Sequence, residues 1–177
     1  WVLFCDDDNH LFPDYIQNAW PILEGNEKIG VLGGQGVALF ETEKPEWFDK
    51  FRLSFAVGPQ ADKDGKLSHN SKRHLHSAGS FFRKQPLLEI FNRGFSTIMV
   101  GYRGAQLSGG EDTEWCILMK LMGYELWYSS NLKFHHCMPK NRMTWTYYLN
   151  LKKGISSGAA RLESYTLFSK RDNPGVL

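Results

Sequence analysis

Residues 1–8 of the chain, WVLFCDDD, are an apolar run that ends in three adjacent aspartates. Successive apolar residues predict a strand that is buried on both faces. Three charges in a row cannot lie inside that strand, so we expect them at its end, where parallel-sheet folds bind their ligands. Because side chains alternate along an extended chain, Asp6 and Asp8 should point to one side and Asp7 to the other.

The spacing of Asp6 and Asp8 raises the question of a bound cation. Two carboxylates on one side of a strand repel each other unless a cation lies between them, and Mg²⁺ and Mn²⁺ take oxygen ligands of this kind. A solvated acidic turn explains the triplet equally well by itself, because Asp and Asn are frequent in turns. The rest of the chain has to decide between these two interpretations.

The composition is that of one folded domain. The chain has 177 residues, of which 42% are hydrophobic and 23% charged, ordinary values for a globular protein. The net charge of +2 is too small to indicate nucleic-acid binding. No apolar run approaches the ~18–20 residues that cross a bilayer. The widely spaced cysteines Cys5, Cys116 and Cys137 favour free thiols in a reducing, cytoplasmic compartment.

The chain begins inside what reads as a central strand, with no preceding helix or hairpin. We therefore expect residues 1–177 to be a single domain that is the C-terminal part of a larger one. Its core should lie within 1–153, and residues 154–177, which are weakly patterned, should form a C-terminal extension with one further helix and a frayed end.

Hydrophobic periodicity predicts the elements that follow. Predicted strands cover 29–32, 37–40, 76–82, 125–128 and 134–137, with a turn or bulge at the glycine run 33–36 and a turn at Asn131. Predicted helices begin near Pro13, Pro45, Pro86, Glu111 and Trp145. The first of these helices should bury the apolar stripe Ile16, Ala19, Trp20 and Leu23, and the last should end at Gly154.

The segment SGGEDTE at 108–114 precedes a predicted helix that Gly123 ends. Acidic residues in the first turn of a helix complement its dipole, and this is a sufficient structural reason for Glu111 and Asp112. The functional alternative is that the two glycines deliver these carboxylates to the edge of a cleft, where one of them acts as a general base.

His135 and His136 are adjacent on a predicted strand and therefore point to opposite faces. At most one of them can serve a given site, and a lone histidine is more often a structural residue than a ligand. Arg142 and Thr144 follow shortly after, ahead of the last predicted helix.

These motifs, in this order, resemble those of the family 2 glycosyltransferases with the GT-A fold. Residues 1–9 with Pro13-Asp14-Tyr15 are similar to the strand and helix that carry the family's Asp-x-Asp motif. Ser77-Ala78-Gly79 is similar to its Gly-Ala-Gly segment near the acceptor, with Ser77 in place of the first glycine. Gly110–Glu114, followed by Gly123-Tyr124, is similar to the family's Glu-Asp motif and the helix behind it. Phe134-His135-His136 is similar to its terminal His strand, and Arg142-Met143-Thr144 to the Arg that follows that strand.

The resemblance covers about residues 1 to 150 and implies an α/β domain with a partial GT-A fold, a mixed sheet flanked by helices. It implies transfer of a sugar, with inversion, from a nucleotide-diphosphate sugar to an acceptor hydroxyl. Mn²⁺ or Mg²⁺ would be held by Asp6, Asp8 and His136. The family parallel favours Asp112 over Glu111 as the general base.

The same resemblance assigns the remaining binding residues. Arg142 and His135 would contact the donor diphosphate. Ser77, Ala78, Gly79 and Trp115 would contact the acceptor, a glycan or a lipid-linked glycan. The expected partners are therefore the nucleotide sugar and this acceptor, without nucleic acid. A location at the inner face of the membrane, peripheral membrane contact and a homo-oligomer are compatible with the family.

The family's nucleotide-binding half precedes the Asp-x-Asp strand, and this chain has no counterpart of it. The resemblance therefore implies that the fragment is inactive alone and that its sheet has an exposed edge. Two other functions compete. A metal-dependent phosphoesterase would use Asp6, Asp8 and His135 or His136, and a non-catalytic carbohydrate-binding module would use the 14% aromatic residues to stack on sugars.

Overall fold

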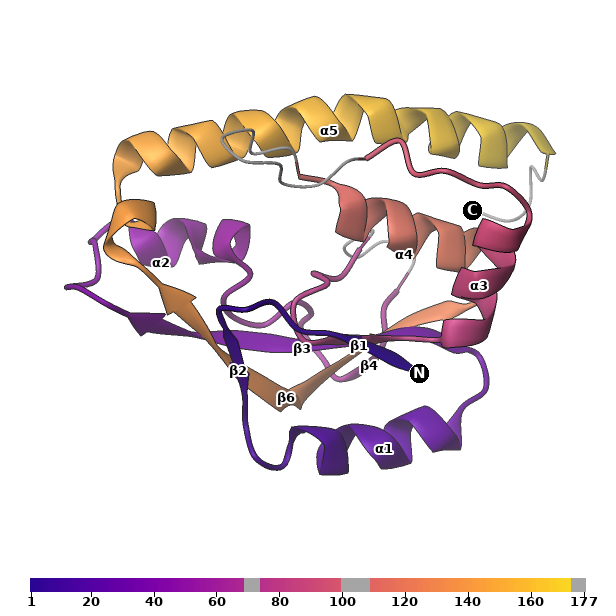
Figure 1. The fold of residues 1–177 in the computed structure, drawn as a ribbon, viewed down its shortest axis with the longest axis horizontal. Helices are drawn as coiled ribbons and strands as arrows, with labels where there is room; N and C mark the ends of the chain where they lie inside the picture. Colours follow the sequence, from indigo (N-terminus) through magenta and orange to yellow (C-terminus); the bar gives the residue numbers. More distant parts are fainter. Residues whose placement is uncertain (69–73, 100–108, 173–177) are drawn as a thin grey trace.

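The computed structural model describes residues 1–68, 74–99 and 109–172. It is a mixed α/β fold in which a curled, mixed sheet is flanked by helices (Figure 1). The described strands are β1 Val2–Phe4, β2 Asn9–Leu11, β3 Ile29–Phe40, β4 Gly65–Lys66, β5 Ser80–Phe82 and β6 Glu125–Met138. The helices are α1 Tyr15–Gly25, α2 Phe48–Phe51, α3 Lys84–Asn92, α4 Glu111–Leu121 and α5 Trp145–Asp172, with 3₁₀ turns η1 Arg52–Phe55 and η2 Lys140–Arg142.

The parallel pair of β3 and β6 forms the centre of a sheet with the strand order β1-β5-β3-β6-β2, and β4 pairs with β6. The register of β3 and β6 shifts between Gly33 and Gln35. A Cβ on Gly34 would lie 2.1 Å from the carbonyl oxygen of Leu132, so glycine is needed for the close approach of the two backbones. Of the turn and the bulge that were the two expected structures for the glycine run, the bulge is the one observed.

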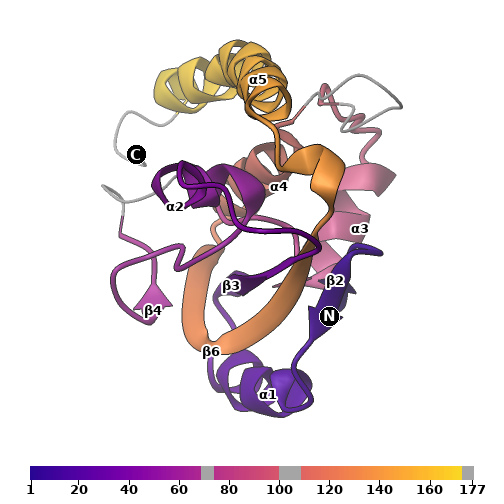
Figure 2. The ribbon, with the colours of Figure 1, turned by 90° about the vertical axis from the view of Figure 1, so that its left-hand side faces the viewer.

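Both central strands are longer than the sequence pattern predicted. Residues 29–40 form one strand, because the bulge bends β3 without ending it. The turn expected at Asn131 is absent, since β6 is continuous over fourteen residues. Figure 2 shows that β6 curves strongly along its length. Curvature allows a strand to change direction while it keeps its pairing with both neighbours.

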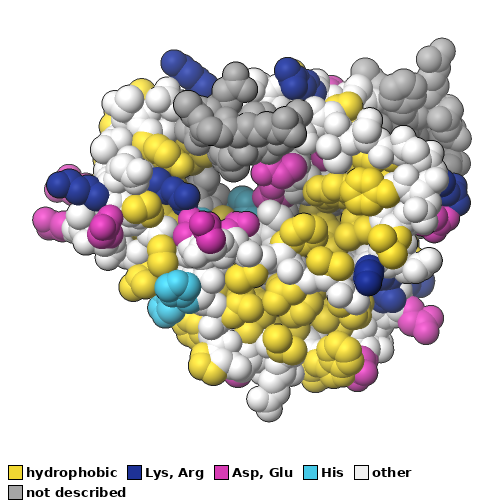
Figure 3. Space-filling model, viewed as in Figure 1, with side chains coloured by type: hydrophobic (Ala, Val, Ile, Leu, Met, Phe, Trp, Pro, Cys, Tyr) yellow, Lys and Arg dark blue, Asp and Glu magenta, His cyan; other side chains and the backbone are white. Residues whose placement is uncertain are grey.

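The position of β1 corrects the first sequence prediction. β1 lies at the end of the sheet, where it pairs antiparallel with β5 (Leu3↔Phe81), and no described strand pairs with its other edge. Its side chains are only partly buried, and that of Phe4 is 38% exposed. The apolar run therefore marks an edge strand: Leu3 packs on the core cluster of Tyr15 and Phe81, and Phe4 packs on Phe82 from the other face. Figure 3 shows apolar side chains gathered over this side of the molecule.

Helix α1 buries a different stripe from the expected one. Tyr15, Ala19 and Leu23 are buried, whereas Ile16 and Trp20 are 57% and 49% exposed. Tyr15 fixes the rotation of the helix, because its ring stacks on a core phenylalanine and its hydroxyl donates a hydrogen bond to the carbonyl oxygen of Gly79. The sequence could not identify the buried face, because apolar residues occupy the helix surface on either side of Ala19, at Tyr15 and Leu23 and at Ile16 and Trp20.

Helix α5 continues through Gly154 to Asp172, so the predicted end at Gly154 is wrong. It passes over α4 and α2 on the side of the sheet opposite to α1 (Figure 1). Tertiary packing holds α5 together across its glycines: Gly158 is buried, and a Cβ there would lie 2.2 Å from the carbonyl oxygen of Gly109. Among the described helices, none combines the length and apolarity that a membrane span requires.

Replacing Gly158 with Ala is expected to destabilise the protein. The new methyl group collides with backbone at Gly109, and overpacking of this kind costs ~1–3 kcal/mol, partly offset by the ~1 kcal/mol gain in helix propensity. Ser156 is exposed on the same helix, so Ser156→Ala gains propensity without a collision and serves as the control. Urea unfolding should show a lower midpoint for Gly158→Ala than for Ser156→Ala, and equal or reversed midpoints would contradict this packing.

Candidate functional site

A cleft of about 950 Å³ lies between the ends of several strands and helix α5. Its walls are the 6–8 segment after β1, the η1 region, the residues that precede β5, the start of α4 and the end of β6. Residues of α5, including Leu151, Lys152 and Ile155, form the side opposite to the sheet. Figure 3 shows the hollow between acidic side chains, with a histidine inside it.

Backbone hydrogen bonds place the aspartate triplet at this cleft. The chain turns back after β1 through a bond from the N–H of Asn9 to the carbonyl oxygen of Asp6, 3.0 Å. The N–H of Cys137 in turn donates to the carbonyl oxygen of Asp8, 2.9 Å. The triplet is therefore a tight turn that is fixed against the end of β6.

Most of the residues singled out from the sequence line this one cleft. They are Asp6, Asp8, Ser77, Ala78, Glu111, Asp112, His136 and Arg142. The expected convergence of the aspartate turn, the Glu-Asp helix start and one histidine is therefore observed. Their chemical roles remain predictions.

Asp8 lies at the centre of a polar group. Its Oδ2 atom is 2.6 Å from Nη1 of Arg142, and its Oδ1 atom is 3.4 Å from Nε2 of His136. Asn9 also donates to Oδ1, at 3.0 Å. No Lys or Arg lies near the aspartate triplet in the sequence, and the 3₁₀ turn η2 brings Arg142 to the carboxylate from the other end of the chain.

The cleft carries an excess of negative charge. Among the described residues that line it, six are acidic and only Arg142 and Lys152 are Lys or Arg. The pKa of Asp6 is raised, by the burial of its carboxyl group first and by the charge of Asp8 second, although the residue as a whole is exposed. Burial, followed by the charge of Asp112, also raises the pKa of Glu111. This uncompensated charge favours the binding of a cation.

Asp6, Asp8 and His136 line the same cleft and are of the residue types that bind divalent cations. Asp6 and Asp8 supply carboxylate oxygens, which Mg²⁺ and Mn²⁺ prefer. Burial lowers the pKa of His136 against the opposing charge of Asp8, which favours the neutral imidazole, the form that binds metals. Arg142 competes with a cation for Asp8, and a bound anion beside the cation would draw the guanidinium away.

Asp112 has partners that its neighbour Glu111 lacks. The N–H of Ser77 donates to Oδ2 of Asp112 at 3.2 Å, and Nδ1 of His76 lies 3.8 Å from the same oxygen. Burial acts to raise the pKa of Asp112, but His76, the Ser77 N–H and His74 outweigh it and hold the pKa below its usual value. Oε2 of Glu111, by contrast, is buried without a hydrogen-bond partner among the described residues.

The two adjacent histidines point to opposite faces, as strand alternation predicts. His136 enters the cleft, whereas His135 packs its ring 4.9 Å from that of Phe12. His135 does not line the cleft, so a donor diphosphate bound there would not contact it as expected.

Two of the expected acceptor residues also lie elsewhere. Trp115 points away from the cleft and packs against Phe91, with ring centroids 5.4 Å apart. Gly79 has a positive φ of 66°, and a Cβ there would meet the ring of Phe134 at 2.7 Å. The glycine therefore serves the packing of the turn before β5, while Ser77 and Ala78 reach the cleft.

Glu114, the last acid of the Glu-Asp segment, has a structural role. Its side chain is completely buried. Its two oxygens accept the N–H groups of Ile98 and Met99, at 2.9 and 3.1 Å, and Oε1 also accepts the hydroxyl of Tyr165, at 2.5 Å. Glu114 therefore joins α4 to α5 and helps to keep α5 over the cleft.

Sequence patterns missed several cleft residues. His74 falls in loop-like sequence, which has no periodicity to predict its direction. His76 opens the strand predicted over 76–82, but only Ser80–Phe82 is a strand, because the chain turns before it. The contribution of α5 could have been suspected from Leu151, Ile155 and Leu162, because these residues repeat at helical spacing beyond the supposed end of the helix. Nothing in the sequence pairs His76 with Asp112.

No protein-family model and no curated protein matches this chain.

Proposed function

We propose that the cleft transfers a sugar, with inversion at the anomeric carbon, from a nucleotide-diphosphate sugar to an acceptor hydroxyl. The observation that carries the proposal is the meeting of two acidic segments about one hundred residues apart. Asp6 and Asp8 line the same cleft as Glu111 and Asp112, and the charge of Asp112 contributes to the raised pKa of Asp6. Sugar transfer needs anionic groups of these two kinds, one for a cation and one for a proton.

Asp6, Asp8 and His136 would hold Mn²⁺ or Mg²⁺. The cation would neutralise the diphosphate, which is otherwise a poor leaving group. Arg142 is placed to add a second positive charge at the same point, because its guanidinium already lies 2.6 Å from Asp8. A diphosphate bound there would exchange this contact for bidentate bonds to phosphate oxygens.

Asp112 would accept the proton of the acceptor hydroxyl as that oxygen attacks the anomeric carbon. Its carboxylate is ionised at neutral pH, because its pKa is held low, and one oxygen is already occupied by Ser77 and His76. Glu111 is the alternative base. Its raised pKa makes it a stronger proton acceptor, although less of it is ionised at a given pH.

The acceptor would enter between the 77–78 segment and helix α5. The α5 wall is mainly apolar at Leu151, Ile155 and Leu162, and the opposite wall is acidic. A glycan acceptor that carries an apolar portion, such as a lipid-linked glycan, matches these two surfaces. We also propose that the mixed α/β fold is a partial GT-A fold, on the basis of the order of the motifs and their meeting at one cleft.

The reaction class is tested by incubating the full-length protein with a panel of nucleotide-diphosphate sugars and Mn²⁺ or Mg²⁺. The proposal expects release of a nucleoside diphosphate from one donor, dependent on the cation. Release of orthophosphate from simple phosphate esters, without reaction of any donor, would indicate a phosphoesterase instead. Binding of glycans without turnover of any donor would indicate a carbohydrate-binding module.

A further inference from the structure

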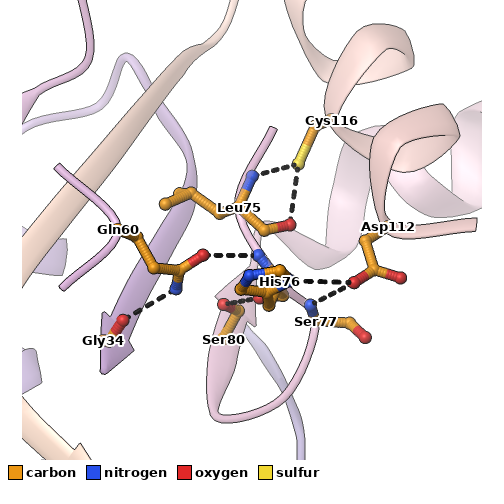
Figure 4. A network of polar contacts seen from close by, with 8 residues as sticks. All are labelled: Gly34, Gln60, Leu75, His76, Ser77, Ser80, Asp112 and Cys116. Atoms are coloured by element: carbon orange, nitrogen blue, oxygen red, sulfur yellow. Dashed lines mark hydrogen bonds and ion pairs between the residues drawn. The ribbon is translucent and has the colours of Figure 1, made fainter. Parts of the chain in front are cut away.

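The segment that precedes β5 is held rigidly on both sides of His76 (Figure 4). The N–H of Leu75 donates to the sulfur of Cys116 in α4, at 3.4 Å. The N–H of His76 donates to Oε1 of Gln60, at 2.7 Å, and Nε2 of Gln60 donates to the carbonyl oxygen of Gly34 in β3, also at 2.7 Å. The backbone at His76 is therefore fastened to the helix that carries Asp112 and to the central strand.

A further contact fixes the turn after this residue. The hydroxyl of Ser80 donates to the carbonyl oxygen of His76, at 2.6 Å. Both backbone polar groups of His76 are thus satisfied by side chains, so the backbone position from which the imidazole projects is fixed. Its Nε2 atom is buried and has no hydrogen-bond partner in the described part of the chain. The Nδ1 edge is the one that faces a polar group, namely Asp112.

The imidazole and the Ser77 N–H meet the same oxygen of Asp112. Figure 4 shows the second oxygen of this carboxylate pointing away from both partners. Two contacts to one oxygen set the rotation of the carboxylate. The other oxygen is then available to a ligand in the cleft.

Comparison with the adjacent carboxylate separates this effect from the general environment. Glu111 and Asp112 line the same cleft, and the charge of Asp6 interacts with both carboxyl groups. The pKa of Glu111 is raised, and that of Asp112, which also has His74 nearby, is lowered. Against the effect of burial, His76, the Ser77 N–H and His74 lower the pKa of Asp112, whereas burial and the charge of Asp112 raise that of Glu111. Of the two carboxylates, only Asp112 contacts His76 and Ser77.

We propose that His76 is a positioning residue for Asp112: its imidazole, carried on a backbone that is held on both sides, turns the carboxylate toward the cleft and keeps the Nδ1 edge against Oδ2. This inference rests on the proposed function only in that Asp112 is taken as the base. The pairing of the two side chains stands on the contacts alone. The sequence gives no sign of it, because thirty-five residues separate the partners.

The substitutions His76→Asn and His76→Gln test the proposal, because both introduce an amide but place its nitrogen at different distances from the backbone. In His76→Asn the amide nitrogen occupies about the place of Nδ1, so a donor still faces Asp112. In His76→Gln the amide extends toward the place of Nε2, so the cavity is filled but Oδ2 loses this partner. We expect the Gln variant to lose about 10²-fold in kcat, with the KM for the donor nearly unchanged, and the Asn variant to recover most of that loss.

A second readout does not depend on activity. Carbon-13 NMR of the Asp112 carboxyl group, assigned with Asp112→Asn, should show its titration moved to higher pH in His76→Gln and close to that of the unsubstituted protein in His76→Asn. Identical titrations and kcat values in the two variants would overturn the proposal. If no donor reacts but the titration still moves in His76→Gln, the proposed function fails while the pairing of His76 with Asp112 is upheld.

Discussion

Replacing Asp8 with Ala is expected to reduce sugar transfer to the level of the EDTA-treated protein. Asp8 is the carboxylate that contacts both Arg142 and His136, so its loss removes a cation ligand and the partner of the guanidinium together. Neutralising charge on the leaving diphosphate is typically among the largest contributions to such a reaction. The measurement is donor turnover as a function of Mn²⁺ concentration.

Two controls separate loss of function from loss of structure in this variant. Arg142 is 35% exposed, so leaving it unpaired should cost little stability. The buried Asn9 loses its acceptor, so thermal unfolding of Asp8→Ala should show a modest loss of stability, about 1–3 kcal/mol, with the fold intact. Asp7→Ala removes the neighbouring charge of the same turn and is expected to reduce turnover far less. Undiminished turnover of Asp8→Ala in excess EDTA would contradict a cation-dependent role for this residue.

Replacing Asp112 with Asn is expected to lower turnover by ~10²–10⁴-fold, the usual contribution of a general base. Asn keeps the shape of the side chain and is well tolerated near a helix start, so the binding of the donor should be nearly unchanged. The measurement is kcat with the KM for the donor, compared with those of Glu111→Gln. A large loss in Glu111→Gln with a small loss in Asp112→Asn would transfer the role to Glu111.

The pH dependence of kcat distinguishes the same two carboxylates without any substitution. A general base works only when ionised, so turnover is present above its pKa and falls as the pH falls through it. Because the pKa of Asp112 is lowered, kcat should fall only at a pH below the ordinary pKa range of aspartate if Asp112 is the base. Because the pKa of Glu111 is raised, kcat would fall at a pH above the ordinary range of glutamate if Glu111 is the base. A fall of kcat at this higher pH would therefore identify Glu111.

Local rules predicted the parts of the site that depend on one element. Alternation along a strand placed His135 and His136 on opposite faces, and His136 indeed enters the cleft. The predicted helix start at Glu111 is correct, because Gly110 adopts a φ of 127° that favours glycine and acids suit the first turn. Both rules act within a few residues and need no knowledge of the partner element.

Predictions that required knowledge of distant segments were wrong or missing. The apolar run of β1 could not show that it occupies the end of the sheet, because the pattern of side chains does not report which strands pair with its two edges. Gly154 does not end α5, since packing of Gly158 on Gly109 and the bond from Tyr165 to Glu114 hold the helix together. The pairing of Arg142 with Asp8 crosses 134 residues, a separation at which sequence spacing carries no information.

The anomeric configuration of the transferred sugar tests the central claim most directly. Proton NMR of the product formed by the full-length protein with its donor and Mn²⁺ reports this configuration from the coupling of the anomeric proton. A base at Asp112 that acts on the face opposite to the leaving diphosphate, with a cation at Asp6 and Asp8, predicts a product of inverted configuration that does not form in EDTA. A product with retained configuration, or cleavage of the donor without sugar transfer to any acceptor, would contradict the account.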